Sequence, residues 1–436
     1  MKYHLITFGC QMNKSDSERI SAVLRTMNLV ETEIVEEADL IVLNTCSVRQ
    51  ASEDRVSGMT NNFAKLKNKK PDLIVVVTGC IPGRDKSGML KERLHGVDLY
   101  FPIFELPLLP KRLSEINPKF LPVGELSCDY LALAPIFNSQ FQAFVPIQTG
   151  CDQYCSYCVV PYARGREKNR PLKDILIEVK KLAEKGCLEI TLLGQVVNHY
   201  LAPDPENFSA SNIYQKNDFA KLLWELNQIK GIKRIHYTGP HPIFMDEEAI
   251  DALTLPNQVN FLHLPVQSGS SAVLKRMNRK YDRDYYLKLV EKIKEKRPEI
   301  ALGTDIILGF CGETEVDFED TLDLYRQCDF DIGYLAKYSA RSGTTAFTSF
   351  ADDVLQSEKE KRWQILQDLM EKIVLRKNQF YVGKKVAVLV DHFKDGKCYG
   401  NSSEMKLVEF GGKVEMMGTI QNVLIEKAEE WILRGK

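Results

Sequence analysis

The chain has 436 residues, 44% of them hydrophobic and 27% charged, which is typical of a globular protein of two or three domains. No run of about 18 apolar residues occurs, so the sequence predicts no membrane-spanning helix and no membrane partner. Because 58 Lys and Arg residues balance 59 Asp and Glu residues, overall basicity is excluded as a means of binding nucleic acid. A nucleic-acid partner would need a local basic patch.

Eleven cysteines are the unusual feature of this composition. The N-terminus, MKYHLITFGC, lacks the long apolar stretch and the small-residue cleavage site of a signal peptide, so we expect a cytoplasmic protein. Disulfides are rare in that reducing compartment, and metal binding or redox chemistry becomes the leading use for the cysteines.

The first 100 residues repeat one strand–turn–helix unit three times. Buried parallel strands are predicted at Tyr3–Phe8, Asp39–Asn44 and Asp72–Val77, with helices at 15–27 and 52–67. Each strand ends in a small-residue turn with a cysteine, and these are Cys10, Cys46 and Cys80. Since the carboxyl ends of parallel strands line one edge of a sheet, we expect the three thiols to share a site. Three separate core cysteines are the alternative.

The middle of the chain predicts a second α/β unit after a loose connection. Between Phe104 and Phe141 prolines recur, which predicts a linker with little regular structure. Six strands then alternate with helices up to Trp363, which predicts an all-parallel sheet curved into a partial or complete barrel. The strands are expected at Phe144–Gln148, Glu189–Leu193, Arg234–Thr238, Val259–Pro265, Leu302–Leu308 and Ile332–Tyr338, and the helices at Leu172–Lys185, Asp218–Ile229, Asp246–Leu253, Asp282–Lys296 and Glu315–Gln327.

The tail changes character after a helix predicted at Glu358–Asn378. From Tyr381 onward, short strand-like runs and Gly-rich turns predict a small all-β module. The fold class is therefore α/β, with an open parallel N-terminal sheet, a (β/α)6 partial barrel and a small C-terminal β-barrel. We expect these domains at 1–117, 137–367 and 370–434, with a linker at 118–136.

The sharpest local motif is a C-x3-C-x2-C triad, Cys151, Cys155 and Cys158, after the first barrel strand. Three thiolates on one loop suffice for a [4Fe–4S] cluster whose fourth iron stays open. A closed zinc site would need a fourth protein ligand, and the nearest candidates downstream are the isolated Cys187 and His199. The motif therefore favours an iron–sulfur site at the end of the barrel where catalytic groups gather.

The other barrel strands also end in polar or Gly-rich turns. Glycine permits close backbone approach to a ligand, and Gln, Ser and Asn side chains provide hydrogen bonds. Together these turns predict a wide polar cavity above the barrel. They lie at 193–195, 238–241, 265–270, 308–313 and 339–341.

The motifs TFGCQMNKSDSE, LNTCSVR, VTGC, CDQYCSYCVVPYARGREKNRP and LHLPVQSGS resemble those of the radical S-adenosylmethionine methylthiotransferases, over nearly the whole chain. Within that family these motifs are most similar to those of the branch that modifies isopentenyladenosine in tRNA. The sequence departs from the family in two places. Cys311 stands where proline is usual, and the stretch YTGPHP differs from the family's pattern, so the resemblance assigns no contacts to Thr238–His241.

This resemblance implies two [4Fe–4S] clusters and S-adenosylmethionine as cofactors. It assigns Cys151, Cys155 and Cys158 to the radical-generating cluster and Cys10, Cys46 and Cys80 to an auxiliary cluster. No side chain is implied as a catalytic acid or base, because the clusters carry the chemistry. The S-adenosylmethionine contacts expected from it are Gln195, Ser268, Gly269, Asp305 and Ala340. The other cysteines are expected to be structural, namely Cys128, Cys187, Cys311, Cys328 and Cys398.

The tail resembles a TRAM domain, a small RNA-binding β-barrel. Between Arg376 and Lys397 six basic residues stand against two acidic ones, a local surplus that favours phosphate binding. The resemblance implies methylthiolation of C2 of N6-isopentenyladenosine at position 37 of tRNA. Its implied partners are the tRNA anticodon stem-loop and a flavodoxin- or ferredoxin-like electron donor, and we expect a monomer.

Two alternatives stay open from the sequence. The same chemistry could act on N6-threonylcarbamoyladenosine in tRNA or on a ribosomal protein, since one substituent decides the substrate. A different class would be a non-catalytic, zinc-stabilised RNA-binding protein.

Overall fold

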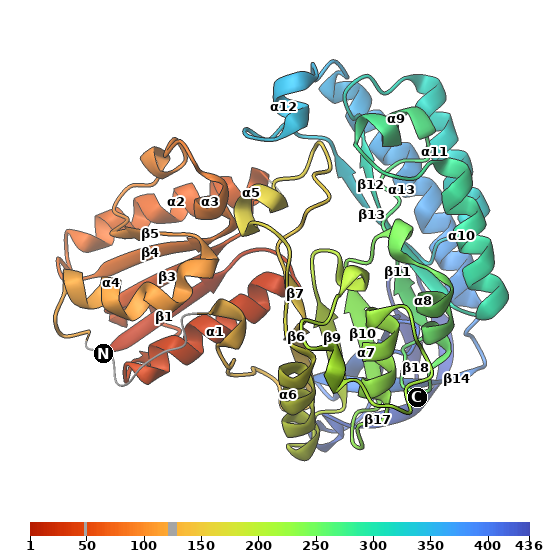
Figure 1. Cartoon of the computed structure of the whole chain (residues 1–436), viewed down its shortest axis with the longest axis horizontal. Coiled ribbons are helices and arrows are strands. Elements are labelled where there is room, and N and C mark those ends of the chain that lie inside the picture. Colours follow the sequence, from red (N-terminus) through yellow and green to blue (C-terminus); the bar gives the residue numbers. More distant parts are fainter. Residues whose placement is uncertain (48–49, 121–128) are drawn as a thin grey trace.

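The computed structural model describes residues 1–47, 50–120 and 129–436, so Cys128 lies outside the described residues. Three bodies follow one another along the chain: an α/β domain, a curved parallel sheet covered by helices, and a small closed β-barrel (Figure 1). This is the architecture that the sequence predicted. Within the described residues, no helix combines the length and the apolar character that a membrane span requires.

The N-terminal domain is a five-stranded parallel sheet in the order β2-β1-β3-β4-β5. Its centre, β3 and β4, is buried on both faces because helices cover both sides, which explains the continuous apolar runs. The short edge strands β2 and β5 were not predicted, because two residues leave no periodic pattern. The elements are β1 (Lys2–Thr7), α1 (Gln11–Thr26), β2 (Val30–Glu31), β3 (Leu40–Thr45), α2 (Gln50–Lys67), β4 (Ile74–Gly79), α3 (Cys80–Arg84), β5 (Leu99–Tyr100) and α4 (Leu109–Ile116).

The segment predicted as a loose linker is more ordered than expected. Helix α4 lies within it, and Pro110 sits in the first turn of that helix, where a missing N–H costs no hydrogen bond. Phe120 and Tyr130 are buried in the same core as β1 and β3. The described residues of this segment therefore belong to the packing of the N-terminal domain.

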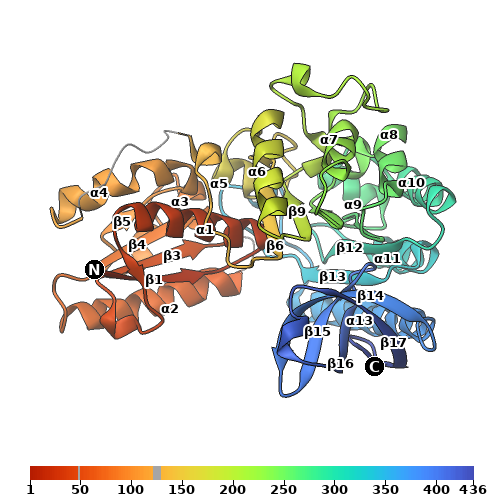
Figure 2. The same ribbon diagram turned by 90° about the horizontal axis from the view of Figure 1, so that it is seen from below.

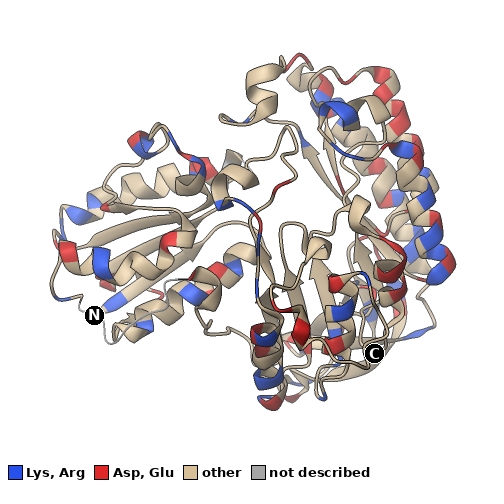
Figure 3. Ribbon diagram, in the orientation of Figure 1, with Lys and Arg blue, Asp and Glu red and all other residues tan. Residues whose placement is uncertain are grey.

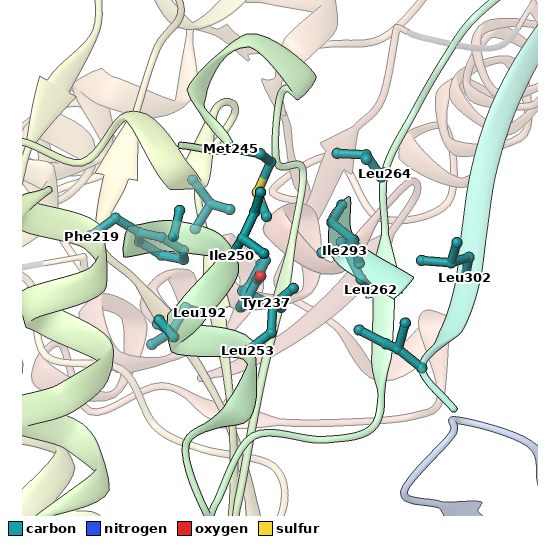
Figure 4. Close-up of a cluster of buried hydrophobic side chains, with 14 of the residues drawn as sticks. Leu192, Phe219, Tyr237, Met245, Ile250, Leu253, Leu262, Leu264, Ile293 and Leu302 are labelled. Carbon is teal, nitrogen blue, oxygen red and sulfur yellow. The ribbon is translucent and has the colours of Figure 1, made fainter. Parts of the chain in front are cut away.

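Two three-stranded parallel sheets, β6-β9-β10 and β11-β12-β13, form the partial barrel and are joined by a bridge between Ile235 and Gln258. Side chains of the strands and of the outer helices interdigitate in its core (Figure 4). Strands β6 and β13 are the two edges. The strands are β6 (Gln142–Pro146), β7 (Gln148–Thr149), β8 (Lys168–Asn169), β9 (Glu189–Leu193), β10 (Arg234–Thr238), β11 (Phe261–His263), β12 (Ala301–Leu308) and β13 (Ile332–Lys337).

The helices of this part follow the predicted alternation, with short additions. The five predicted outer helices are observed within about two residues of their expected ends, a normal scatter for helix termini. Helices α5, α9 and α12 are five or six residues long and were not predicted. The helices are α5 (Val160–Arg164), α6 (Leu172–Glu184), α7 (Asp218–Asn227), α8 (Glu247–Asp251), α9 (Ser271–Arg276), α10 (Arg283–Lys296), α11 (Glu315–Cys328), α12 (Thr345–Ser349) and α13 (Gln356–Gln379).

The C-terminal module is a closed five-stranded barrel in the order β14-β15-β16-β18-β17. Helix α13 leads into it, but Met370 and Val374 of that helix are buried in the core of the parallel barrel. Both bodies lie beside α13 when the molecule is seen from below (Figure 2). The strands are β14 (Lys385–Lys394), β15 (Lys397–Ser402), β16 (Leu407–Gly411), β17 (Ile420–Ala428) and β18 (Leu433–Gly435).

Direct contacts fix the small barrel to the amino ends of the parallel strands. Arg234, the first residue of β10, donates to the carbonyl oxygens of Asn401 (2.8 Å) and Ser402 (2.9 Å). Lys406 pairs with Asp331, which directly precedes β13, at 3.0 Å. The module is therefore docked at the end of the barrel opposite to the cysteine loop.

Candidate functional site: two cysteine triads and the contacts between them

The first triad lies at the carboxyl ends of three adjacent strands. Cys10 follows β1 and caps α1, Cys46 follows β3, and Cys80 opens α3 directly after β4. These strands are neighbours in the sheet, so their ends lie side by side. A Cβ placed on Gly9, next to Cys10, would approach the Cβ of Cys46 to 2.7 Å. The three cysteines therefore lie at one edge of the sheet, and their sharing of one site stays a prediction.

Two glycines make these turns possible. Gly9 (φ +119°) and Gly79 (φ +101°) each precede a cysteine in a conformation that other residues rarely adopt. A Cβ on Gly79 would come within 2.4 Å of the Thr45 carbonyl oxygen, so no side chain fits there. Asn13 completes the turn region, because its amide donates to Asn44 (3.2 Å) and to the carbonyl of Thr45 (3.1 Å). This backbone is shaped to bring the cysteines to the sheet edge.

The second triad lies on the loop after β7. The Cys158 amide donates to the Cys155 carbonyl at 2.9 Å, and the Cys151 amide donates to the Gly165 carbonyl at 3.1 Å. Asn278 holds the loop from outside by donating to the carbonyl of Tyr154 (2.9 Å). The loop therefore has a defined conformation, in which Cys155 lies close enough to Cys151 and Cys158 to contribute to raising the pKa of both thiols.

Burial dominates the electrostatics of both triads. It raises the pKa of the Cys151 thiol to about 11 and that of Cys158 to about 12, with the neighbouring cysteines adding to both shifts. Burial likewise raises the pKa of Cys80. A buried thiol of this kind ionises when a bound cation compensates its charge, as a metal centre does.

A buried guanidinium accompanies each triad. Arg279 donates to the Cys155 sulfur at 3.1 Å and also reaches the carbonyl of Pro265 (3.3 Å). Arg164 contacts Cys80, where its charge opposes the upward shift of the thiol pKa that burial causes. Both arginines come from the barrel half of the molecule. Positive groups near the sulfurs favour bound anionic thiolates.

The donor sets fit clusters better than single ions. Among residues 1–47, 50–120 and 129–436, no three His, Cys, Asp or Glu side chains gather tightly enough to hold one metal ion. A zinc ion draws four ligands around one point, whereas an iron–sulfur cubane bonds each thiolate to a separate iron. Two sets of three thiols match the number of protein ligands in a three-thiolate cluster.

The expected S-adenosylmethionine contacts fall into two groups. Gln195 follows β9. Its buried side-chain oxygen has no hydrogen-bond partner within the described residues, so it is available to accept a hydrogen bond from a ligand. Asp305 is 40% exposed on β12, and Ala340 lies in the turn after β13. Ser268 and Gly269 instead pack against α11, where Thr321 accepts from the Gly269 amide at 3.0 Å. The role of all five in cofactor binding stays a prediction.

The four other described cysteines are buried within packed elements. Cys187 donates to the carbonyl of Glu189 at 3.2 Å, and Cys398 lies in the core of the small barrel. Cys311 packs beside Phe310 and Tyr338, and Cys328 ends α11 in the main core. These surroundings favour the structural role that we expected for them.

The structure also shows side chains that the motifs alone did not reveal and that connect the N-terminal domain to the barrel; we call these residues anchors. On one side, Arg164 at the end of α5 pairs with Asp16 of α1 at 2.5 Å, and both side chains are almost fully buried. Asp16 also accepts from the hydroxyl of Tyr130. This cluster joins the barrel loop to the N-terminal domain in a buried interface.

A second connection crosses the same interface. Arg84 of α3 donates to the carbonyl oxygen of Ser342 at 3.0 Å, and Arg341 donates to Gln50 of α2 at 2.5 Å. The anchors follow the cysteines closely: Asp16, Gln50 and Arg84 lie four to six residues after the N-terminal cysteines, and Arg164 lies six after Cys158. This spacing was the only sequence signal for these residues, and it does not show which residue each of them contacts until the fold is known.

Two family models match the chain. Residues 145–325 match the Radical SAM superfamily, and residues 2–102 match a family described as Uncharacterized protein family UPF0004. The first covers the second triad and most of the parallel barrel, and the second covers the first triad. Each triad thus lies in a region with its own family match.

Curated relatives match over the full length. The tRNA-2-methylthio-N(6)-dimethylallyladenosine synthase of Caldicellulosiruptor saccharolyticus is 40% identical over 439 residues, covering 99% of this chain and 91% of that protein. Proteins with the same description from Thermoanaerobacter sp. and Clostridium botulinum are each 39% identical, covering all of this chain and 92% and 96% of theirs.

Solved structures share the fold at low identity. The radical S-adenosylmethionine methyltransferase TsrM from Kitasatospora setae, with cobalamin and a [4Fe–4S] cluster bound, gives a TM-score of 0.55 at 13% identity, covering 79% of this chain and 74% of that one. The cobalamin-dependent radical enzyme OxsB gives 0.55 at 12% identity, covering 98% and 64%. These likenesses support the arrangement of the α/β domains.

Proposed function

The chain belongs to the tRNA-2-methylthio-N(6)-dimethylallyladenosine synthase family, and from this premise we propose that it methylthiolates C2 of N6-isopentenyladenosine at position 37 of tRNA. It is a radical S-adenosylmethionine enzyme that uses [4Fe–4S] clusters. The observation that carries the proposal is the pair of cysteine triads on two domains that are in contact, since Arg164, six residues after Cys158, reaches both Asp16 and Cys80 of the N-terminal domain. An enzyme that used only one triad would not need to hold two cysteine-bearing domains together.

We assign Cys151, Cys155 and Cys158 to the radical-generating cluster and the N-terminal triad to the auxiliary cluster. When bound, these groups with S-adenosylmethionine supply a radical that removes hydrogen from an unactivated adenine carbon and a sulfur that replaces it. The protein supplies the position of each group. Arg279 orients Cys155, and Gln195, Asp305, Ala340, Ser268 and Gly269 are the proposed surroundings of S-adenosylmethionine.

The interface anchors have a direct role in this proposal. Hydrogen abstraction and sulfur delivery must reach the same adenine carbon, so the two triads need a fixed separation. The buried Asp16–Arg164 pair and the Arg84–Ser342 contact hold the two cysteine-bearing edges together. We propose that these contacts position one site relative to the other.

RNA binding by the C-terminal module rests on fewer basic residues than the sequence count suggested. Lys377 pairs with Asp331 at 2.6 Å, Arg376 pairs with Asp329, and Lys397 pairs with Glu409 at 2.7 Å. The remaining three bases of the stretch are exposed, and none forms an ion pair in the part of the chain that the structure describes. They are Lys384, Lys385 and Lys394.

The position of the module sets a minimum length for an RNA that reaches from the top of the barrel to the lysines of the module. It is docked at the amino ends of the parallel strands, and an eight-residue strand such as β12 spans roughly 25 Å. An anticodon stem-loop with its target base above the barrel would extend alongside it to reach these lysines. We propose that the module begins after Gln379, since α13 up to Val374 is part of the barrel core.

We further propose a flavodoxin- or ferredoxin-like electron donor, a monomer as the working form and a cytoplasmic location. These fit a tRNA-modifying reaction that needs an electron for each cofactor cleavage. The test of function uses anaerobically reconstituted protein with synthetic anticodon stem-loops carrying N6-isopentenyladenosine, N6-threonylcarbamoyladenosine or plain adenosine at position 37. Mass spectrometry of the digested nucleosides should show the methylthio product from the first RNA alone. Product from the second RNA, or colourless zinc-loaded protein without product, would overturn the proposal.

A further inference from the structure

Tyr334 is a large aromatic residue on the inner face of the parallel barrel. Its neighbour Gly333 faces outward, because a Cβ there would contact Tyr325 of the outer helix α11. Ile332, two residues before Tyr334, faces inward and meets the inner Gly303 of β12. Since side chains alternate along a strand, Tyr334 and Ala336 also point inward.

The inner position of Tyr334 is open rather than packed. Its side chain is 53% exposed, although barrel interiors are normally filled by layers of side chains. Ala336, the next inward residue toward the carboxyl end, is small and exposed and leaves room above the ring. Strand β13 is the last strand of its sheet, so no further strand pairs with it beyond Tyr334. Packing alone gives no reason for an aromatic ring here.

A polar pair lies beside the ring on the same face. Asp305 of β12 is in register with Tyr334, and its carboxylate bonds to Nε2 of His263 at 3.1 Å. The rings of His263 and Tyr334 are 5.3 Å apart. His263 contacts one carboxylate oxygen, and 40% of the Asp305 side chain remains exposed. The face thus combines a flat aromatic surface with an adjacent hydrogen-bond acceptor.

We propose that Tyr334 is the stacking platform for the adenine base that is modified, an inference that rests on the proposed function. A base in an anticodon loop can be extruded from its stack and held on an aromatic ring. In this inference Asp305 serves the substrate base instead of S-adenosylmethionine, and it would accept a hydrogen bond from the N–H that remains on an N6-alkylated adenine. S-adenosylmethionine also contains adenine, and Asp305 was expected to contact it, so the experiment must separate the two bases.

The experiment compares Tyr334→Ala, Tyr334→Phe and Tyr285→Ala in anaerobically reconstituted full-length protein. Tyr285 is a matched control, because it is 40% exposed but lies on the outer helix α10. Affinity is measured for the N6-isopentenylated anticodon stem-loop, for the same RNA with an abasic nucleotide at that position, and for S-adenosylmethionine. Tyr334→Ala should weaken binding of the intact RNA about 5- to 100-fold, the range of one aromatic–base stack.

The remaining comparisons decide the assignment. Binding of the abasic RNA and of S-adenosylmethionine should be unchanged in Tyr334→Ala, while Tyr334→Phe and Tyr285→Ala should match the wild type on every ligand. Weaker S-adenosylmethionine binding would assign the ring to the cofactor, and equal losses on both RNAs would make its role structural. Unchanged affinities throughout would also overturn the inference. If wild-type protein neither binds nor modifies the stem-loop, the proposed function itself is wrong.

Discussion

The two cysteine triads are built in opposite ways. The barrel triad lies on one loop of eight residues, and its geometry is largely a property of local sequence. The N-terminal triad spans 10 to 80 in the chain and exists only because β1, β3 and β4 are neighbours in a sheet. A site of the first kind can be recognised from spacing, whereas a site of the second kind requires the topology.

This difference has a consequence for robustness. Loss of one loop contact disturbs the barrel triad alone, but the N-terminal triad depends on the packing of a whole domain against its partner. That packing is held by the buried anchors Asp16, Arg84 and Arg164, which form contacts between the two domains. The predictions below test whether the two triads act as separate units that share one interface.

The largest effect should follow from loss of a barrel ligand. Cys155→Ala should reduce 5′-deoxyadenosine formation by more than about 100-fold, exceeding the 10- to 100-fold that loss of an outer hydrogen-bond partner typically costs. Chromatography of the reduced reaction mixture measures this product. Cys187→Ala removes a buried cysteine away from both triads and serves as the control. Cleavage near the wild-type rate in Cys155→Ala would show that this loop does not hold the radical-generating cluster.

Breaking the interface should uncouple the two sites without destroying either. Arg164→Ala leaves Asp16 buried without its cation, which should destabilise the fold by about 3–5 kcal/mol. Where folded, the variant should still cleave S-adenosylmethionine, but methylthio product per cleavage should fall about 10- to 100-fold, since a displacement of about 1 Å can cost 100-fold. Both products are quantified in the same reaction.

The matched control is Arg234→Ala. The Arg234–Glu189 pair is also buried, but it lies at the opposite end of the barrel, where Arg234 also contacts the small barrel. This variant should lose stability too, yet keep the ratio of the two products when the stem-loop RNA is saturating. Arg164→Lys, which retains the charge, should recover part of the coupling. If Arg164→Ala keeps the wild-type ratio, the interface does not set the relation between the sites.

A smaller effect is expected from the C-terminal module. Replacing Lys384, Lys385 and Lys394 together by Ala should weaken binding of the stem-loop and flatten its salt dependence by roughly 2–3 in the log–log slope. Cleavage of S-adenosylmethionine should be unchanged. A salt titration of binding measures the slope, and the exposed lysines Lys288, Lys292 and Lys296 of α10 provide the control triple variant. Equal slopes would leave RNA binding to the other two domains. Basic and acidic residues are interspersed along α10 (Figure 3).

The smallest effect concerns stability and leaves the chemistry untouched. Burial raises the pKa of Glu18 to about 7, and its carboxylate accepts from the Asn138 amide across the domain interface at 3.2 Å. Below the unfolded pKa the group is protonated in both states, so no stability is lost there. Between about pH 4.5 and 7 the carboxyl ionises in the unfolded chain but keeps its proton in the folded one, so stability falls across this range by about 3 kcal/mol in all.

Glu18→Gln should therefore remove this loss. Thermal unfolding of the variant and the wild type should agree near pH 5 and diverge at pH 8, with the variant more stable. Glu115→Gln, at an exposed position on α4, should follow the wild type at both pH values. Equal unfolding temperatures for Glu18→Gln and wild type at pH 8 would show that the carboxylate is ionised without penalty.

The sequence predicted the parallel units, the closed tail and all six cysteines at strand ends, because hydrophobic period and turn residues are local signals. It did not predict the packing of residues after Leu109, where a short helix has a proline in its first turn, nor the pairing of the basic residues Arg376 and Lys377 with acids of the barrel. The partners of Asp16 and the open position of Tyr334 also depend on contacts between distant segments. Such contacts have no signature within a single stretch of sequence.

The most direct test of two separate triads is Cys46→Ala in the N-terminal site. Anaerobically reconstituted variant protein is analysed for iron content, 5′-deoxyadenosine and methylthio nucleoside in one preparation. We predict that iron falls by about half, on one cubane per three cysteines, that S-adenosylmethionine cleavage persists and that methylthio product disappears. Retained methylthio product would contradict the assignment of the converging cysteines, and joint loss of cleavage would contradict the separation of the two sites.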